Sequence, residues 1–292
     1  MARHFSTARP KKARLGQNFL VSPSAPAAIL GAMGDLRGSC VLEIGPGHGV
    51  LTRSLAERSL HLTAVELDPV LAAGLRAEFA TRPEVEILEE NILRVELDSL
   101  RSPAGERWRV VGNLPYYITS EILLHLFRHH AAIETAVLMM QREVADRVTA
   151  SPGGRDYGLL SATTQMYAKA ESLFTLPPDA FSPPPQVYST VVRLTMHPRF
   201  AELEVPEEPF LRFLRQLFAQ KRKTLANNLR AAGYEPAAIQ KALPQEMQTV
   251  RAETVSLETM AQLFRALESQ PAILTARLPG DSSETDGEQT AQ

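Results

Sequence analysis

The chain has 292 residues and a net charge of −2, and 44% of its residues are hydrophobic, as in ordinary globular proteins of one large or two modest domains. No apolar run approaches the roughly 20 residues of a membrane span, so we expect no membrane-spanning segment. The only cysteine, Cys40, excludes a disulfide within the chain. The basic N-terminus lacks the apolar region of a signal peptide, which favours a cytoplasmic location.

Two basic runs stand out because neither contains an acid. Their members are Arg3, Arg9, Lys11, Lys12 and Arg14 in the first, and Arg212, Arg215, Lys221, Arg222, Lys223 and Arg230 in the second. Acids gather instead in the C-terminal tail, 271–292, which is expected to be disordered. This separation is typical of a surface that binds a polyanion, although a charge run alone is more often a solvated face.

Residues 1–20 form a basic arm that ends in Leu15-Gly-Gln-Asn-Phe-Leu20. Because polar Asn18 is flanked there by apolar side chains, we expect the end of the arm to dock on the following domain. A helix cap or turn is the alternative role for this asparagine. A first helix is expected over 25–33.

A strand, a glycine turn and a helix follow in succession. The apolar run 40–45 predicts a buried parallel strand, Gly45-Pro-Gly-His-Gly49 forms the turn, and residues 50–58 form an amphipathic helix. Glycines allow positive φ and let a ligand approach the backbone closely. The spacing differs from the dinucleotide pattern Gly-x-Gly-x-x-Gly, and nothing here resembles a phosphate-binding Gly-Lys-Ser.

The second strand, 61–67, ends in an acid, Glu66, about 20 residues after the glycine turn. An acid in this position is suited to accept both ribose hydroxyls of a nucleoside. A plain surface carboxylate is the alternative. A helix over 69–80 and a third strand over 85–88 follow.

The fourth strand is expected to break at Gly112 and to offer Asn113-Leu-Pro-Tyr116 at its end. Pro115 cannot donate a ladder hydrogen bond, so the strand must stop here. In open α/β sheets this edge binds ligands. The oxygen of Asn113 and the carbonyl of Leu114 can each accept one N–H of an exocyclic amino group, while Tyr116 stacks on the ring. A turn with a capping asparagine is the alternative for the tetrapeptide taken alone.

The remaining elements are expected at the following positions. After the strand at 108–111 come a helix at 119–130, a strand at 135–140, helices at 142–150 and 159–167, and a last strand at 190–195. From about Pro198 only helices are expected, at 207–220, 222–232, 235–243 and 256–268. His125, His129 and His130 lack a matching acid cluster, so we predict no metal site.

A proline-dense loop, Phe181-Ser-Pro-Pro-Pro-Gln-Val-Tyr-Ser189, precedes the last strand. The prolines fix an extended loop, and Phe181 at its start is placed to face the Asn113 pocket. A rigid linker with Phe181 anchored in the core is the alternative.

Alternating strands and helices predict a doubly wound, mostly parallel sheet. A glycine turn after the first strand and an acid after the second build a site for a cofactor that contains adenosine. Because no cradle for a triphosphate or pyrophosphate is present, S-adenosylmethionine is favoured over NAD or ATP. An Asn-Leu-Pro-Tyr strand end then suits transfer of a methyl group to an amino nitrogen.

Seven ordered motifs resemble the rRNA adenine N6-dimethyltransferases, and within them the bacterial small-subunit (16S) branch of the KsgA (RsmA) type. The motifs are Leu15–Leu20, Val41–Thr52, Asn113–Tyr116, Gln141–Ala145, Tyr157–Gly158, Phe181–Ser189 and Lys221–Leu225. The resemblance spans roughly residues 10–270. It implies a Rossmann-like class I methyltransferase domain of seven strands at 21–197 and a small helical RNA-binding domain at 198–270.

The resemblance also implies an activity and a site. The activity is dimethylation of two adjacent adenosines in a hairpin loop near the 3′ end of 16S rRNA, with S-adenosylmethionine as donor and without a metal. The cofactor contacts implied are Asn18, Leu20, Gly45, Glu66, residue 91 and Asn113, and Gly47 of the same glycine turn is added to them. Where the family usually has Asp at 91, this chain has Asn91, so weaker cofactor binding is our hypothesis. Tyr188 also stands where Asp is common.

The chemistry then assigns roles. Adenine N6 is a poor nucleophile because its lone pair is delocalised into the ring. Acceptors at Asn113 and Leu114 favour a pyramidal nitrogen aimed at the methyl group. The methylated ammonium gives its proton to water, so we predict no catalytic carboxylate. Tyr116, and by resemblance Phe181, would stack on an extruded base.

RNA loops are recognised by splayed bases and backbone phosphates, which gives the basic runs a role. Candidate RNA-binding residues are Arg14, Lys221, Arg222 and Lys223. The partner expected is 16S rRNA within the small ribosomal subunit, bound by a monomer. Two alternatives stay open: an enzyme acting on 23S rRNA or DNA, and an assembly factor of the small subunit that binds without turnover.

Overall fold

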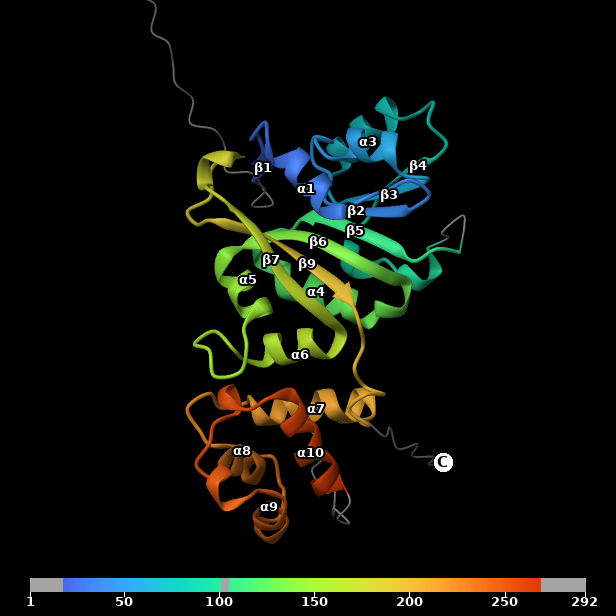
Figure 1. Cartoon of the computed structure of the whole chain (residues 1–292). Helices are drawn as coiled ribbons and strands as arrows, with labels where there is room; N and C mark the ends of the chain where they lie inside the picture. Colours follow the sequence, from blue (N-terminus) through green and yellow to red (C-terminus); the bar gives the residue numbers. More distant parts are fainter. Residues whose placement is uncertain (1–17, 101–104, 269–292) are drawn as a thin grey trace, which may run out of the picture.

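The computed structural model of the chain describes residues 18–100 and 105–268 (Figure 1). Its centre is a seven-stranded sheet in the order β4-β3-β2-β5-β6-β9-β7. The strands are β2 (Cys40–Ile44), β3 (His61–Glu66), β4 (Val85–Glu89), β5 (Trp108–Asn113), β6 (Ile133–Gln141), β7 (Ala168–Leu176) and β9 (Ser189–Met196). Strands β4, β3, β2, β5 and β6 pair in parallel, and β9 runs antiparallel between β6 and β7. The predicted mostly parallel, doubly wound sheet is confirmed.

Helices cover both faces of this sheet (Figure 1). One face carries α1 (Ala25–Met33), α2 (Thr52–Arg58) and α3 (Pro69–Glu78), and the other carries α4 (Thr119–Arg128), α5 (Arg142–Thr149) and α6 (Leu159–Tyr167). Successive side chains of a strand point to opposite faces. Val41 and Val111 therefore belong to the first core, and Leu42 and Val110 to the second. Because both faces are covered, the central strands are mostly apolar, with Glu43 in β2 as a buried exception.

The chain described after β9 is helical and packs below α6 in Figure 1. Its helices are α7 (Glu207–Leu217), α8 (Leu225–Ala231), α9 (Pro236–Ala242) and α10 (Leu257–Glu268). The rings of Phe210 and Phe213 each lie 5.4 Å from the ring of Phe264. The hydroxyl of Tyr167 in α6 donates to Glu207 at 2.6 Å, which links the helical part to the sheet. The division expected between residues 197 and 198 stays a prediction.

Several expected element boundaries are off by two or three residues, such as the end of α7 at Leu217 instead of 220, and two of them have a clear physical cause. Strand β5 does not break at Gly112 but continues through Asn113. A Cβ at Gly112 would lie 2.8 Å from the carbonyl oxygen of Ile44, so this glycine allows β5 to approach β2. Helix α8 begins at Leu225, because the side chain of Thr224 caps it by accepting from the backbone N–H of Asn227. The helix expected from residue 222 therefore starts three residues later.

Three strands were not expected from the sequence. Strand β7 is a half-exposed edge strand with an irregular register between Ser172 and Phe174, which breaks the alternation that marks a strand. Strand β1 (Phe19–Leu20) pairs antiparallel with β8 (Phe181–Ser182) in a separate two-stranded sheet. The end of the N-terminal arm thus docks on the domain through the segment that opens the proline-dense loop.

Part of the expected organisation falls outside the described residues. The basic arm before residue 18, with Arg14, and the acidic tail after residue 268 belong to it. In the described ranges, no helix is long and apolar enough to cross a membrane.

Candidate active site at the carboxyl edge of the sheet

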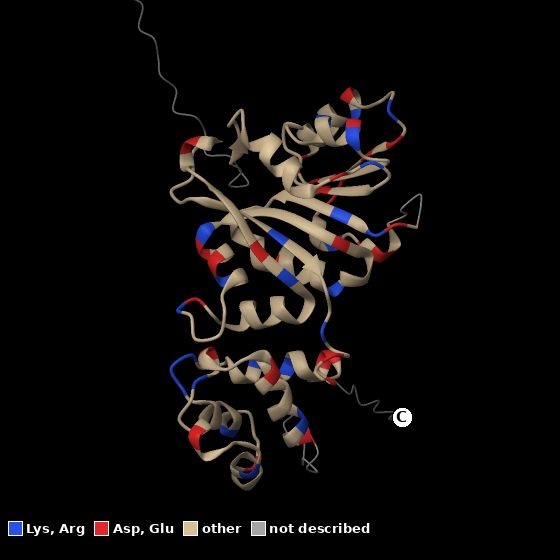
Figure 2. Cartoon of the chain, viewed as in Figure 1, with Lys and Arg blue, Asp and Glu red and all other residues tan. Residues whose placement is uncertain are grey.

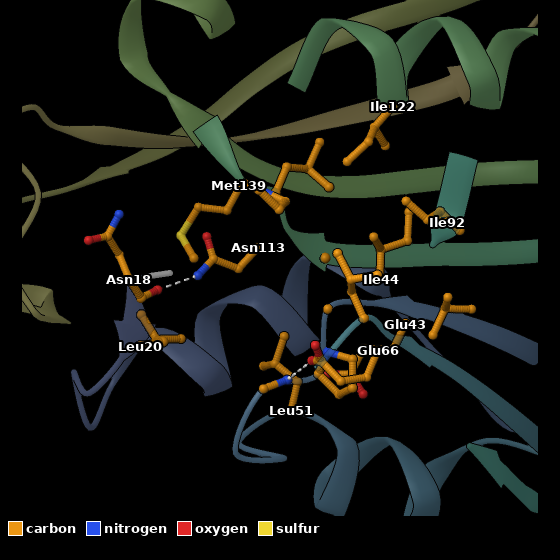
Figure 3. A pocket seen from close by; sticks show the side chains of 18 of the residues that line it. Asn18, Leu20, Glu43, Ile44, Leu51, Glu66, Ile92, Asn113, Ile122 and Met139 are labelled. Carbon is orange, nitrogen blue, oxygen red and sulfur yellow. Dashed lines mark hydrogen bonds between the residues drawn. The ribbon is translucent and has the colours of Figure 1, made fainter. Parts of the chain in front are cut away.

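A cavity opens where the parallel strands β2, β3 and β5 end (Figure 3). It collects segments that are far apart in the sequence, namely the N-terminal strand, the glycine turn, the end of β3, the turn after β4 and the end of β5. Its lining includes the predicted residues Asn18, Leu20, Gly45, Gly47, Glu66, Asn91, Asn113, Leu114 and Tyr116. The carboxyl edge of a doubly wound sheet is where such folds bind ligands.

Glu66 is held rigidly beneath the glycine turn. Its side chain is only 2% exposed. One carboxylate oxygen accepts from the backbone N–H of Gly47 at 3.0 Å, and the other accepts from that of Asp68 at 2.9 Å. Gly47 has a φ of +58°, which favours glycine, and a Cβ there would lie 3.1 Å from the ring of Phe19. The turn and the acid therefore form one preorganised unit.

Glu43 is a site residue that the sequence analysis did not single out. It lies at the end of β2, is 2% exposed and lines the cavity next to Glu66 (Figure 3). Burial, and to a lesser degree the charge of Glu66, raise the pKa of Glu43 to about 7. Among the described residues its Oε2 atom has no hydrogen-bond partner. An acid inside the otherwise apolar run Cys40–Ile44 was the signal available in the sequence.

Asn113 ends β5 with its amide oriented by the N-terminal strand. Its Nδ2 donates to the carbonyl of Asn18 at 2.9 Å, so the side-chain oxygen is left as an acceptor (Figure 3). The next residue, Leu114, donates its N–H to the carbonyl of Met139 at 2.9 Å. Among the described residues, neither the Asn113 oxygen nor the Leu114 carbonyl receives a hydrogen bond. The structure therefore brings together the two acceptors that the sequence predicted.

Tyr116 follows this pair at the mouth of the cavity. Its hydroxyl lies 2.5 Å from the hydroxyl of Ser189, the first residue of β9. Burial raises the pKa of Tyr116, which keeps the phenol neutral. This hydrogen bond holds the ring of Tyr116 at the same carboxyl edge of the sheet at which Asn113 ends β5.

Phe181 does not line the cavity. It is 3% exposed and packs in the core below the N-terminal strand, in register with Leu20. In this structure it is therefore the core anchor that the sequence left as an alternative. A stacking role would require its side chain to leave this position.

Asn91 caps the short 3₁₀ turn Ile92–Arg94, because its side-chain oxygen accepts from the N–H of Leu93 at 3.0 Å. The oxygen is thus already engaged, and the side-chain nitrogen is the remaining polar atom. An aspartate at this position would keep the cap with one oxygen and present a second acceptor to a ligand.

Three of the four predicted RNA-binding residues lie in the helical part and do not line this cavity, and the fourth, Arg14, is outside the described residues. Lys221, Arg222 and Lys223 are exposed on the loop between α7 and α8, where Figure 2 shows a cluster of Lys and Arg. Within the described residues, none of the three pairs with an acid. No group of three or more His, Cys, Asp or Glu among those residues is arranged to hold a metal ion.

The fold and this edge together define a Rossmann-like methyltransferase. A family model described as "Ribosomal RNA adenine dimethylase" matches residues 8–269. The ribosomal RNA small subunit methyltransferase A of Acidobacterium capsulatum is 59% identical over 261 residues, which cover 89% of this chain and 92% of that protein. The protein of the same name from Koribacter versatilis is 51% identical over 280 residues, 91% and 98% of the two chains. The chain belongs to the ribosomal RNA adenine dimethylase family.

Solved structures support the same fold. A dimethyladenosine transferase from Plasmodium falciparum superposes with a TM-score of 0.71 at 22% identity, over 86% of this chain and 98% of that one. The 23S rRNA methyltransferase ErmE superposes with a TM-score of 0.63 at 28% identity, over 86% of this chain and all of the other. Each superposition covers 86% of this chain, which is more than the sheet and its flanking helices make up. Both superpositions therefore include residues of the helical part.

Proposed function

We propose that the protein uses S-adenosylmethionine to dimethylate the N6 amino groups of two adjacent adenosines in a hairpin loop near the 3′ end of 16S rRNA. The observation that carries this is the pair of open acceptors on Asn113 and Leu114 beside the aromatic ring of Tyr116. The names of the most similar relatives support the small subunit as the substrate particle. That substrate implies a cytoplasmic location.

The cavity fits the proposed cofactor. Glu66 offers carboxylate lone pairs toward a ribose, and the left-handed glycine turn leaves room for a ligand against the backbone. The buried Oε2 of Glu43, which lacks a partner among the described residues, is a further polar atom available to a ligand in the cavity. The cofactor supplies an electrophilic methyl group on a sulfonium sulfur. The residues that would hold it are Asn18, Leu20, Gly45, Gly47, Glu66 and Asn91.

The chain's own residues position the nucleophile. Accepting one N–H at Asn113 and the other at the Leu114 carbonyl draws both amino hydrogens to one side. The lone pair of N6 is thereby turned out of conjugation and toward the cofactor. Tyr116 stabilises the extruded base by stacking, worth on the order of 1–3 kcal/mol. After transfer the nitrogen is a strongly acidic ammonium, so it loses its proton to water and can be methylated again.

The loop between α7 and α8, here called the basic loop, provides the proposed contacts to RNA outside the cavity. Lys221, Arg222 and Lys223 carry three cations without acid partners among the described residues, which suits phosphate contacts outside the cavity. We propose that this loop holds the ribosomal particle while the cavity receives single bases. Binding as a monomer is part of the proposal.

The decisive experiment measures methyl transfer from labelled S-adenosylmethionine to small subunits that lack the modification, followed by nucleoside analysis. Naked large-subunit rRNA and duplex DNA serve as parallel substrates. We expect N6,N6-dimethyladenosine only in the small subunit, and loss of the product in Asn113→Ala. Label in large-subunit RNA or DNA would contradict the proposal that 16S rRNA is the substrate. Tight binding to the small subunit without methyl transfer would indicate that the protein acts as an assembly factor and not as an enzyme.

A further inference from the structure

An exposed aromatic ring and a cation form a pair beside the cavity, outside the site described so far. Tyr188, in the proline-dense loop directly before β9, is 46% exposed. The guanidinium carbon of Arg142 lies 5.2 Å from the centroid of its ring. The backbone N–H of Arg142, at the start of α5, also donates to the carbonyl of Tyr188 at 2.9 Å. The ring and the cation are therefore held together by the main chain as well as by their side chains.

The pair lies beyond the reacting edge of the sheet. Asn113, Met139 and Val191 occupy one row across β5, β6 and β9. Because β9 is antiparallel to β6, residues before Val191 extend past the carboxyl edge of the parallel strands. Tyr188 is three residues earlier, roughly 10 Å further along at about 3.3 Å per residue. The next residue, Ser189, has its hydroxyl 2.5 Å from the hydroxyl of Tyr116. The side chain of Ser189 therefore links the Tyr188–Arg142 pair to the ring of Tyr116, which is proposed to stack on the base.

The charge of Arg142 is not neutralised locally. Within the described residues no acid lies within salt-bridge distance of its guanidinium. The neighbouring acid, Glu143, is paired with Arg147 one turn later on α5. A flat ring with an uncompensated guanidinium on it is the combination on which single-stranded RNA bases stack.

We propose that Tyr188 and Arg142 form a stacking shelf for the nucleobase next to the adenosine in the cavity. The inference rests on the proposed function and names a second contact with the same RNA. In a substrate with two adjacent adenosines, one base enters between Asn113 and Tyr116 while its neighbour lies on the shelf. The shelf then keeps the RNA loop splayed, which favours entry of a single base.

The first test compares steady-state kinetics on small subunits. Tyr188→Ala raises the KM for the particle by roughly fivefold to a hundredfold, because one stacked base is lost, while kcat and the Kd for S-adenosylmethionine stay near those of the parent. Tyr188→Phe keeps the plane and stays close to the parent, whereas Tyr188→Leu behaves like the alanine variant. Arg142→Gln gives a smaller rise in KM. The matched control is Leu60→Ala, an equally exposed residue (48%) just before β3, at the opposite edge of the sheet.

The second test separates stacking from a merely structural role of the loop. A hairpin RNA with 2-aminopurine beside the target adenosine is titrated with the full-length protein. Fluorescence is quenched on binding by the parent and by Tyr188→Phe, and not by Tyr188→Leu. Equal KM values and equal quenching in Phe and Leu variants would overturn the shelf. If the parent itself transfers no methyl group to the particle, the proposed function fails instead, so the two failures are distinguishable.

Discussion

The cavity at the sheet edge and the basic loop of the helical part differ in how their polar groups are held. In the cavity, both oxygens of Glu66 and the amide nitrogen of Asn113 are fixed by backbone hydrogen bonds before any ligand arrives. On the loop, Lys221, Arg222 and Lys223 are exposed, and among the described residues they have no acid partner. Recognition of a small cofactor needs atoms in fixed positions, whereas attraction of a polyanion needs only charge at the surface.

The loop is nevertheless anchored at its base. The amide nitrogen of Asn228 donates to the carbonyls of Leu217 at 2.8 Å and Gln220 at 3.3 Å. This buried asparagine joins the end of α7 to the start of the loop, so the backbone is positioned while the cations remain free to adapt. Changes in the cavity are therefore expected to act on cofactor and rate, and changes in the loop on affinity for RNA.

Glu66→Ala is expected to have the largest effect. It removes the charged acceptor of two backbone N–H groups and the proposed ribose contact, each hydrogen bond to a charge being worth about 1.5–3 kcal/mol. The Kd for S-adenosylmethionine measured by calorimetry should rise roughly a hundredfold to a thousandfold. Glu57→Ala, an exposed acid on α2, is the control. A Kd within threefold of the parent would contradict the role of Glu66.

Glu43 makes the stability of the cofactor-free protein depend on pH. Because its pKa is raised to about 7 in the folded chain from an ordinary value of 4.5, the folded state binds more protons between these values. Stability is then lost as pH rises from about 4.5 to 7, by up to about 3 kcal/mol. Urea unfolding from pH 4.5 to 8 should show this loss.

In Glu43→Gln the same titration should show a smaller loss, and the variant should be more stable than the parent at pH 8. The exposed change Glu57→Gln serves as the matched control and should leave the pH dependence as it is. Parallel curves for the parent and Glu43→Gln would show that the carboxyl of Glu43 is ionised in the fold at ordinary pH.

Replacing Lys221, Arg222 and Lys223 together by alanine tests the other region. Affinity for the small subunit should fall roughly tenfold to a hundredfold, and the salt dependence of log K should become shallower by up to about three units. The Kd for S-adenosylmethionine should not change. The control is a triple alanine variant at the exposed residues Arg37, Arg58 and Arg94. An unchanged salt slope would remove the loop from the RNA interface.

Asn91→Asp should have the smallest effect and the opposite sign. One oxygen can keep the cap on Leu93 while the second accepts a hydrogen bond from the cofactor with the assistance of charge. Binding of S-adenosylmethionine should tighten about fivefold. Asn227→Asp, on the exposed face of α8, is the control. Equal or weaker binding of S-adenosylmethionine in Asn91→Asp would contradict the hypothesis that Asn91 lowers the affinity for this cofactor.

Local sequence predicted the parts of the site that depend on neighbouring residues. The apolar run before Gly45, the glycine turn and the helix after it are a strand, a turn and a helix by composition alone. Asn113-Leu-Pro-Tyr116 is confined to a strand end by its proline. Parallel strands bring such ends to one edge, so the partnership of Glu66 with the glycine turn followed from the fold class.

Contacts between distant segments decided the rest. The burial of Glu43, the close approach of β2 at Gly112 and the core position of Phe181 each depend on a partner far away in the sequence. Strand β7 escaped prediction because a bulge interrupts its alternation, and only pairing with β9 defines it.

The sequence by itself determined the fold class, the edge at which the cavity forms and the residues that end the strands there. The reason is that the periodicity of apolar residues and the backbone effects of glycine and proline act over only a few residues. Only the tertiary structure decided which atoms are left open. The oxygen of Asn113 is an acceptor because Asn18, 95 residues away, takes the nitrogen. Tyr188 lies beside Arg142 because β9 pairs with β6. Hydrogen-bond partners and neighbours across strands are set by packing, which no local pattern records.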